Sequence, residues 1–424
     1  MSYFEEGLKL FRETKFERAL ELFIKALEED SNNSEIYNYL GISKQALGLY
    51  EEAINYYSKG TEIDENYAEL YYNRADCKCN LGFYEEAVKD YDKVIELIPT
   101  HSMAYDNRGF AKGNLGYYEE AIKDIDKSII LDSMNIDAYM DRAFIKLMFG
   151  KYIESIEDYQ KVLELDDKEI HAYNGIGDIK RSMGLYEEAI FYYDKVLEIS
   201  NANSSYAYNG RGICKIGLGM YNEAIDDINK ALEIYDEYTD AYNNRGTAKY
   251  NLGLYKQSIE DFDRAIELSP QYFYAYNNRG NSKSTLGLYK EAIEDFNISI
   301  SIEPQYIDAY YNRALAKNNI NKHLEAIDDY DIVLKLNSNH IDAYFNKALS
   351  FYNLKNYEEA IKNYDKVIEL NPNSADAYNN RGFIKYTISL YEEALKDYDK
   401  ALEIFPDYEK AKQNRDEVLE KINN

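Results

Sequence analysis

The stretch Ala-Tyr-Asn-Asn-Arg-Gly at residues 241–246 recurs at residues 275–280 and 377–382, at offsets of 34 and three times 34 residues. A fixed period of this length is typical of a solenoid, in which each repeat packs against its neighbours along the chain. Extending the register in both directions gives twelve repeats, of which one carries an extra residue, and a remainder at 409–424. The predicted repeats are 1–33, 34–67, 68–101, 102–135, 136–169, 170–204, 205–238, 239–272, 273–306, 307–340, 341–374 and 375–408.

Glycine and proline divide each repeat into two predicted helices, which we call helix A and helix B. Eight glycines, Gly48 and Gly287 among them, stand at position 15, where a left-handed C-cap would end helix A. Eight more, including Gly280, stand at position 8 inside helix A, where glycine costs about 1 kcal/mol and therefore indicates a close helix crossing. All five prolines fall at position 32, between helix B and the next repeat. The tyrosines and alanines recur at helical spacing and form the predicted core.

Arginine at position 7 and aspartate at position 23 occur together in eight repeats, and the other four repeats contain neither. Because a buried charge is costly alone and tolerable when paired, this joint occurrence predicts a packed ion pair between helices A and B. Lysine at position 11 lies one turn beyond the arginine and is expected to share the aspartate. The predicted pairs are Arg74–Asp90, Arg108–Asp124, Arg142–Asp158, Arg211–Asp227, Arg245–Asp261, Arg279–Asp295, Arg313–Asp329 and Arg381–Asp397.

The composition limits the classes of partner. The 49 Lys and Arg residues against 77 Asp and Glu residues give a net charge of −28, which repels both phosphate backbones and anionic lipid headgroups. We therefore expect no nucleic-acid and no membrane partner. The chain starts without a basic, apolar leader, and its three cysteines fit a reducing compartment, so we expect a cytoplasmic protein.

At this point the chain resembles the tetratricopeptide repeat family. The family pattern has an aromatic residue at position 4, Gly or Ala at 8, Ala at 20, an aromatic at 24, Ala at 27 and Pro at 32, and the twelve repeats share its register. The departures are at positions 7 and 11, where the family usually has Leu and Tyr. The resemblance implies an all-α, right-handed superhelical solenoid closed by a capping helix at 409–424, with helix A lining a concave groove.

In this family position 6 projects into the groove, and here that position is mostly asparagine. A row of amides could hydrogen-bond the backbone of an extended peptide, or could simply tolerate a solvated groove, and the sequence leaves both interpretations open. Tyrosines at position 12 could add apolar anchors. The candidate peptide-binding residues are Asn73, Asn107, Asn244, Asn278, Asn312, Asn346 and Asn380 at position 6, Asn243 and Asn277 at position 5, and Tyr250, Tyr352 and Tyr386 at position 12.

Co-chaperones of this family grip acidic chaperone tails with lysines at positions 2 and 5, and neither position carries Lys or Arg here. Position 2 instead carries Asp in several repeats, including Asp240 and Asp376, which favours a basic or neutral partner segment. The asparagine row is interrupted by Asp141, Gly175 and Gly210, and the extra residue falls in 170–204. A bend is therefore possible near residues 200–205, with the main groove after it.

These features predict a protein-protein interaction scaffold or adaptor that binds an extended peptide or a partner protein. A self-associating structural protein built from the superhelix is the alternative. We expect no enzyme, because the four histidines are scattered and the sequence lacks a phosphate-binding glycine loop, a nucleophile-base pair and metal-ligand spacing. For the same reason we expect no cofactor and no metal.

Overall fold

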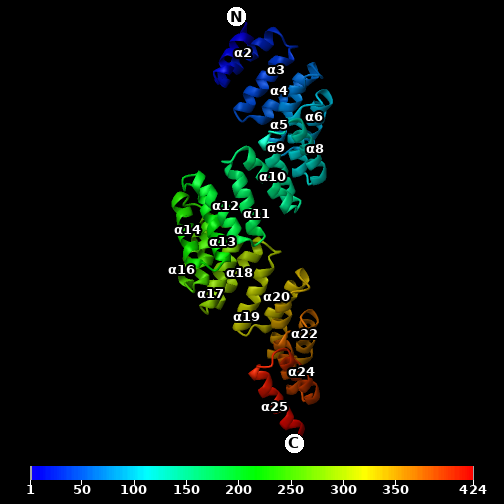
Figure 1. Cartoon of the computed structure of the whole chain (residues 1–424), viewed down its shortest axis with the longest axis vertical. Helices are drawn as coiled ribbons and strands as arrows, with labels where there is room; N and C mark the ends of the chain where they lie inside the picture. The colour runs from blue at the N-terminus through cyan, green and yellow to red at the C-terminus, as the bar shows by residue number, and fades with distance from the viewer. Residues whose placement is uncertain (1, 424) are drawn as a thin grey trace. The chain divides into compact units, whose positions relative to one another are not determined.

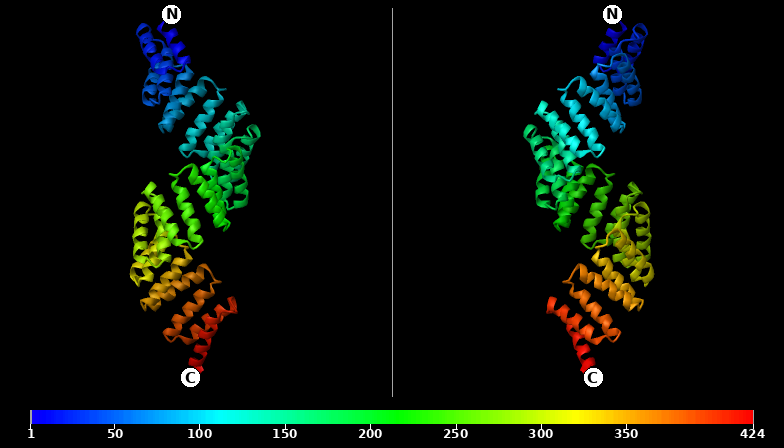
Figure 2. Two further views of the ribbon diagram at one scale, coloured as in Figure 1. Left: turned by 90° about the vertical axis from the view of Figure 1, so that its left-hand side faces the viewer. Right: turned by 90° about the vertical axis from the view of Figure 1, so that its right-hand side faces the viewer.

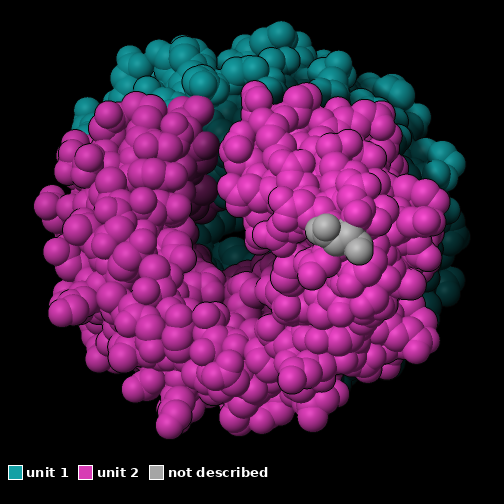
Figure 3. All heavy atoms as spheres, turned by 90° about the horizontal axis from the view of Figure 1, so that it is seen from below, with its two compact units in different colours: residues 1–202 teal, residues 203–424 magenta. Residues whose placement is uncertain are grey.

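The computed structural model describes residues 2–423 of the chain, and these residues form twenty-five α-helices and no strand. The helices fall into two compact units, unit 1 at residues 1–202 and unit 2 at residues 203–424 (Figure 3). Within each unit every helix packs against the helices that precede and follow it in the chain, as the ribbons of Figures 1 and 2 show. The all-α solenoid predicted from the repeat is therefore confirmed in both units.

Helix A of each repeat is an odd-numbered helix and helix B is the even-numbered helix that follows. Unit 1 contains α1 (Tyr3–Arg12), α2 (Phe16–Glu29), α3 (Ser34–Ala46), α4 (Tyr50–Ile63), α5 (Ala68–Asn80), α6 (Tyr84–Leu97), α7 (Ser102–Asn114), α8 (Tyr118–Leu131), α9 (Ile136–Met148), α10 (Tyr152–Leu165), α11 (Ile170–Ser182) and α12 (Tyr186–Ile199). Unit 2 contains α13 (Ser205–Gly217), α14 (Tyr221–Ile234), α15 (Thr239–Asn251), α16 (Tyr255–Leu268), α17 (Phe273–Thr285), α18 (Tyr289–Ile302), α19 (Ile307–Asn319), α20 (His323–Leu336), α21 (Ile341–Asn353), α22 (Tyr357–Leu370), α23 (Ala375–Thr387), α24 (Tyr391–Ile404) and α25 (Glu409–Asn423).

The turn from helix A to helix B is made by one residue in the left-handed conformation. The eight position-15 glycines have φ between 74° and 83°, as the sequence predicted. Four turns use Thr14, Asn321, Lys355 or Ser389 instead, with φ of 57°, 60°, 61° and 65°. Because a side chain makes this conformation costly, these four turns hold their shape against local strain. The register therefore fixes the turn geometry even where glycine is missing.

Helices A and B cross closely at position 8, where glycine lets a large side chain at position 24 lie against the backbone. A Cβ atom built on Gly280 would lie 2.7 Å from the Phe296 ring, and one on Gly109 would lie 2.5 Å from Ile125. The rings or branched side chains at position 24, such as Phe296, are fully buried and form the centre of each repeat's core. The close crossing predicted from the position-8 glycines is confirmed.

Helix α25 packs on α24 through Ala411 and Val418, which are both fully buried. The helical spacing of Ala411, Val418 and Ile422 predicts that all three face inward, but Ile422 is 43% exposed. It lies in the last turn of α25, where no further helix of the described chain follows to cover it. The helix therefore closes the core of the last repeat over most of its length.

The extra residue of the 170–204 repeat lies in the turn after α12, where Asn201 and Ala202 have φ of 51° and 60°. Two successive left-handed residues replace the single extended residue that follows most B helices, such as Asp166 after α10. The division between the two units falls directly after Ala202. A bend at residues 200–205 stays a prediction.

Candidate functional site

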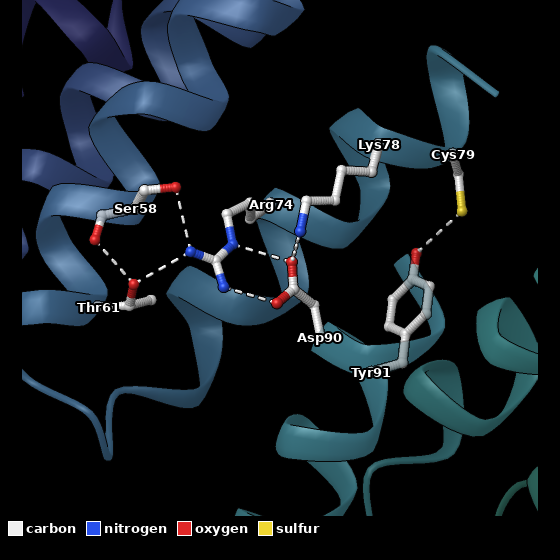
Figure 4. Close-up of polar contacts among 7 residues, drawn as sticks. All are labelled: Ser58, Thr61, Arg74, Lys78, Cys79, Asp90 and Tyr91. Atoms are coloured by element: carbon white, nitrogen blue, oxygen red, sulfur yellow. Dashed lines mark hydrogen bonds and ion pairs between the residues drawn. The ribbon is translucent and has the colours of Figure 1, made fainter. Parts of the chain in front are cut away.

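The arginines at position 7 form the ion pairs that their joint occurrence with aspartate predicted. Arg74 Nε lies 2.8 Å from Asp90 Oδ2, and Arg74 Nη2 lies 2.6 Å from Asp90 Oδ1, so the guanidinium holds the carboxylate with two parallel hydrogen bonds (Figure 4). Lys78 Nζ donates to the same carboxylate at 2.6 Å. The arrangement repeats in all eight Arg–Asp couples, each with its position-11 lysine.

The third arginine nitrogen reaches the preceding repeat, which the sequence did not lead us to expect. Arg74 Nη1 donates to the Ser58 and Thr61 hydroxyls at 3.1 Å (Figure 4), and Arg279 Nη1 donates to Asp263 at 2.5 Å. The guanidinium also lies over the position-4 tyrosine ring, as Arg279 does at 5.4 Å from the Tyr276 centroid. Because the couple joins two helices and two repeats and its members already have partners, it is part of the architecture and offers little to a ligand.

The position-6 asparagines form hydrogen bonds between successive repeats. Except in Asn380, the Nδ2 atom donates to the position-5 side chain of the preceding repeat, 35 residues earlier, and we call this bond a rung. The Nδ2–Oδ1 distance is 3.1 Å from Asn244 to Asn209 and 3.0 Å from Asn278 to Asn243. The rungs are Asn73–Asn38, Asn107–Tyr72, Asn244–Asn209, Asn278–Asn243, Asn312–Asn277, Asn346–Tyr311 and, from α25, Asn414–Asn379.

The rungs divide the predicted asparagines into two groups. Asn243 and Asn277 are 7% and 3% exposed and accept the rungs, so they lie beneath the surface and leave little of themselves for a ligand. The position-6 asparagines are half-buried, and each rung uses one of the two Nδ2 hydrogens. Asn107 also donates to Asp76 and Asn346 to the Asp342 carbonyl, so the second hydrogen remains for a ligand only on the other rung donors, such as Asn312. Asn380 differs because Phe345, its partner position, has no acceptor, and it donates to the Tyr364 hydroxyl at 3.4 Å instead.

The position-12 tyrosines are half-buried and lie against the aromatic residue that begins helix B. The ring centroids of Tyr250 and Tyr255 are 5.3 Å apart, and Tyr352 and Tyr386 make the same contact with Tyr357 and Tyr391. The Tyr250 hydroxyl also lies 3.2 Å from Thr285 Oγ1 of the next repeat. These rings are therefore held in place by their neighbours, with one edge open.

Unit 2 has a pocket of about 340 Å³ that brings two of the predicted residues together. Asn312 and Tyr250 both line it, and no lining residue that the structure describes is charged. The other lining residues are Asn281, Ser284, Thr285, Tyr289, Leu315, Ala316 and Asn319. Hydroxyl and amide groups beside a tyrosine ring can bind a neutral extended backbone by hydrogen bonding and apolar contact.

Unit 1 has a larger pocket, of about 850 Å³, lined by residues of its second to fifth repeats. Of the predicted residues only Asn107 lines it, together with five aspartates and no lysine or arginine among its described lining residues. The lining residues are Gln45, Asp76, Cys79, Asn80, Tyr84, Tyr91, Met103, Asp106, Asn107, Phe110, Asp132, Asn135, Asp137, Met140 and Asp141. We did not predict a role for these carboxylates from the sequence. The signal in the sequence was Asp141, which stands at position 6 in place of asparagine and interrupts the asparagine row.

Three of these carboxylates are harder to ionise than an ordinary aspartate. Burial, together with the charge of nearby Asp137, raises the pKa of Asp106 to about 6, against a hydrogen bond from Asn135 that lowers it. Burial, together with the charges of Asp106 and Asp137, raises the pKa of Asp141 to about 7. Burial also raises the pKa of Asp76, although hydrogen bonds from Tyr91, at 2.5 Å, and Asn107, at 2.9 Å, oppose the rise. The pocket is thus acidic, with buried carboxylates and no lysine or arginine among its described lining residues.

Residues 2–423 contain no group of three or more His, Cys, Asp or Glu side chains placed to hold a metal ion. Within the same range, none of the helices combines the length and the apolar character needed to cross a membrane.

Sequence profiles of the tetratricopeptide repeat match most of the chain. The matched residues are 4–68, 68–101, 104–133, 170–203, 205–238, 239–272, 273–306, 341–374 and 375–408. A comparison with curated protein sequences found no match.

Several solved structures are similar to the chain. The structure of the APC/C hetero-tetramer Cut9-Hcn1 matches over 97% of this chain and 95% of the other, with a TM-score of 0.51 and 15% identity. A tetratricopeptide repeat protein from Parabacteroides merdae ATCC 43184 matches over 58% and 97%, with a TM-score of 0.48 and 22% identity. YrrB, a TPR protein with an unusual peptide-binding site, matches over 45% and 97%, with a TM-score of 0.40 and 25% identity. At 15% identity, the likeness to Cut9-Hcn1 shows the fold alone.

Proposed function

Because the chain belongs to the tetratricopeptide repeat family, which supports a general protein-binding role, we propose that it is an interaction scaffold whose helix-A surfaces bind an extended segment of a partner protein. The observation that carries the proposal is the half-buried asparagines held between repeats, of which Asn312 and Asn107 each line a pocket of their unit. Their side-chain carbonyls, and the Asn312 N–H group that its rung does not use, suit a peptide backbone, which presents a donor and an acceptor at every residue.

The charge of the chain supports a basic or neutral segment. The net charge of −28 and the aspartates of the unit 1 pocket would repel an acidic segment and attract a basic one. The pocket of unit 2 has no charged lining residue among those described, so it suits a neutral stretch of the same segment or of another. Such a scaffold would work without catalysis, and we place it in the cytoplasm.

The pocket of unit 2 allows a direct test. Thr285 is exposed at its edge, so Thr285→Trp should fill part of the pocket and reduce the binding of peptides selected by the full-length protein from a random decapeptide phage library. Lys290→Trp, on the exposed face of α18 and outside the pocket, is the matched control and should leave binding unchanged. Peptides that bind both variants as they bind the wild type would contradict a role for this pocket.

The alternative, a self-associating structural protein, predicts a different result. Sedimentation of the full-length protein over a hundredfold range of concentration should give the mass of one chain if the scaffold proposal is right. A mass that grows with concentration, together with no peptide selected from the library, would favour self-association.

A further inference from the structure

At one place in unit 1, carboxylates stand at both positions that a rung would join. Asp141 stands at position 6 of its repeat and Asp106 at position 5 of the preceding repeat, 35 residues earlier, which is the offset that joins Asn244 to Asn209. In the other rungs an amide nitrogen donates and an oxygen accepts. Two ionised carboxylates offer four acceptor oxygens and no donor, so they cannot form a hydrogen bond with each other.

The consequence is visible at Asp106. Its side chain is buried, at 4% exposed, and its Oδ2 accepts from Asn135 Nδ2 at 3.2 Å. Its Oδ1 has no hydrogen-bond partner among the described residues. A buried carboxylate oxygen without a partner is costly, and Asp106 lines the same pocket as Asp141. The missing group is a donor, and the surrounding carboxylates favour one that is positively charged.

The rest of the pocket suits a long basic side chain. Met103, Phe110 and Met140 line it beside the two carboxylates, and an aliphatic stem can lie along such side chains while its charged end reaches inward. Asp76, which also lines the pocket, already accepts from Tyr91 and Asn107. The unmet demand for donors is therefore concentrated at Asp106 and Asp141.

We propose that the carboxylates of Asp106 and Asp141 bind the ammonium or guanidinium group of a lysine or arginine in the partner segment. The inference rests on the proposed function, because the basic residue belongs to the peptide that the helix-A surface binds. The bound cation supplies the donors that the rung lacks and neutralises two carboxylates that are otherwise close to each other. Unit 1 thereby selects a basic residue at one place in the segment, whereas the amide rungs of unit 2 do not.

The test is a selection of random decapeptides with the full-length protein and with Asp141→Asn. This substitution recreates the amide rung, with a donor for Asp106, and removes one charge. We expect wild-type selections to contain a fixed Lys or Arg and Asp141→Asn selections to lose that preference. A selected peptide should bind Asp141→Asn at least about tenfold more weakly, and replacing its basic residue by Gln should have the same effect on the wild type and almost none on the variant.

Asp132→Asn is the matched control. Asp132 is exposed in the same pocket, and its Oδ1 accepts from the Met134 amide, a bond that asparagine can keep. This variant changes the net charge by the same amount, so an equal loss of affinity would show that only the overall charge matters and would overturn the inference. Circular dichroism of each variant verifies the fold.

Three further outcomes separate the inference from the proposed function. Selected peptides without a basic preference would overturn the inference and leave the scaffold proposal standing. A library from which neither protein selects any peptide would count against both proposals. Calcium ions, added as calcium chloride, are tested without peptide. If they bind the wild type and do not bind Asp141→Asn, an inorganic cation occupies the carboxylate pair, and this too would overturn the inference.

Discussion

Units 1 and 2 are built from the same repeat and differ most at the rungs between repeats. In unit 2 the rungs from Asn244, Asn278 and Asn312 join amide to amide, so each donor meets an acceptor. In unit 1 the corresponding positions carry two acceptors, Asp106 and Asp141, and one buried oxygen of Asp106 is left without a partner among the described residues. Exchanging an amide for an acid of the same shape therefore removes the donor of the contact and leaves a buried acceptor unsatisfied.

The Arg–Asp network is common to both units, and disrupting it should have the largest effect. Arg279→Ala leaves Asp295 buried without its two parallel hydrogen bonds and should lower the free energy of unfolding by about 3–5 kcal/mol. Arg108→Ala should cost unit 1 a similar amount. Hydrogen exchange of α17 and α18, or of α7 and α8, gives the local measurement.

The double variant Arg279→Leu with Asp295→Leu provides the control for this network. It removes both charges and should be less destabilised than Arg279→Ala alone. A double variant that is as unstable as the single variant would argue that the arginine acts through its packing and not through the pair.

Exchanging the rung residues between the units should have opposite effects at pH 8. Asp141→Asn gives Asp106 a donor and should raise the free energy of unfolding by about 1–2 kcal/mol, since it removes an unsatisfied buried acceptor. Asn244→Asp removes the N–H group that donates a hydrogen bond to Asn209 Oδ1 and should lower the free energy of unfolding by a similar amount. Urea denaturation of each full-length variant tests this. Changes in the free energy of unfolding that have the same sign in both variants would contradict the proposed difference between the units.

The effect of Asp141→Asn should also depend on pH. The pKa values of Asp106 and Asp141 are raised in the folded protein, to about 6 and about 7, so the folded state holds protons that the unfolded state releases above pH ~4. The stability from these two groups is therefore fully present below pH ~4 and is lost as pH rises to about 7. Asp76, Asp132 and Asp137 also line the pocket, and their negative charges likewise oppose the ionisation of Asp106 and Asp141.

We therefore expect Asp141→Asn to match the wild type near pH 4 and to exceed it in stability increasingly up to pH 7. Melting temperatures of both proteins measured at intervals across this range provide the test. A difference that does not change with pH would show that the carboxylates keep ordinary pKa values.

The smallest effect is expected at the turns without glycine. Lys355→Gly and Ser389→Gly, both in unit 2, relieve side chains held at φ of 61° and 65° and should each raise the free energy of unfolding by about 0.5–1 kcal/mol. Gly287→Ala, at φ 79° in the same unit, is the matched control and should destabilise by a similar amount. Chemical denaturation at neutral pH is sufficient, and a loss of stability on adding glycine would mean that chain entropy outweighs the strain.

The sequence by itself determined the repeat, the two helices of each unit, the left-handed turns and the Arg–Asp pairs. These depend on residues that lie within one repeat, and glycine, arginine and aspartate at those spacings have few alternatives. Asp141 was visible as an exception, but its meaning was not. The repeat boundaries as domains, and the bend at residues 200–205, stay predictions.

Only the tertiary structure decided what the groove residues do. A rung joins side chains 35 residues apart, one more than the period, and this contact exists only once successive repeats have stacked. Stacking buried Asn243 and Asn277 beneath the surface, tied Asn312 to its neighbour, and left Asp106 with an unpaired oxygen. Because burial and the choice of hydrogen-bond partner are properties of the packed array, the position of a residue within its repeat could not reveal them.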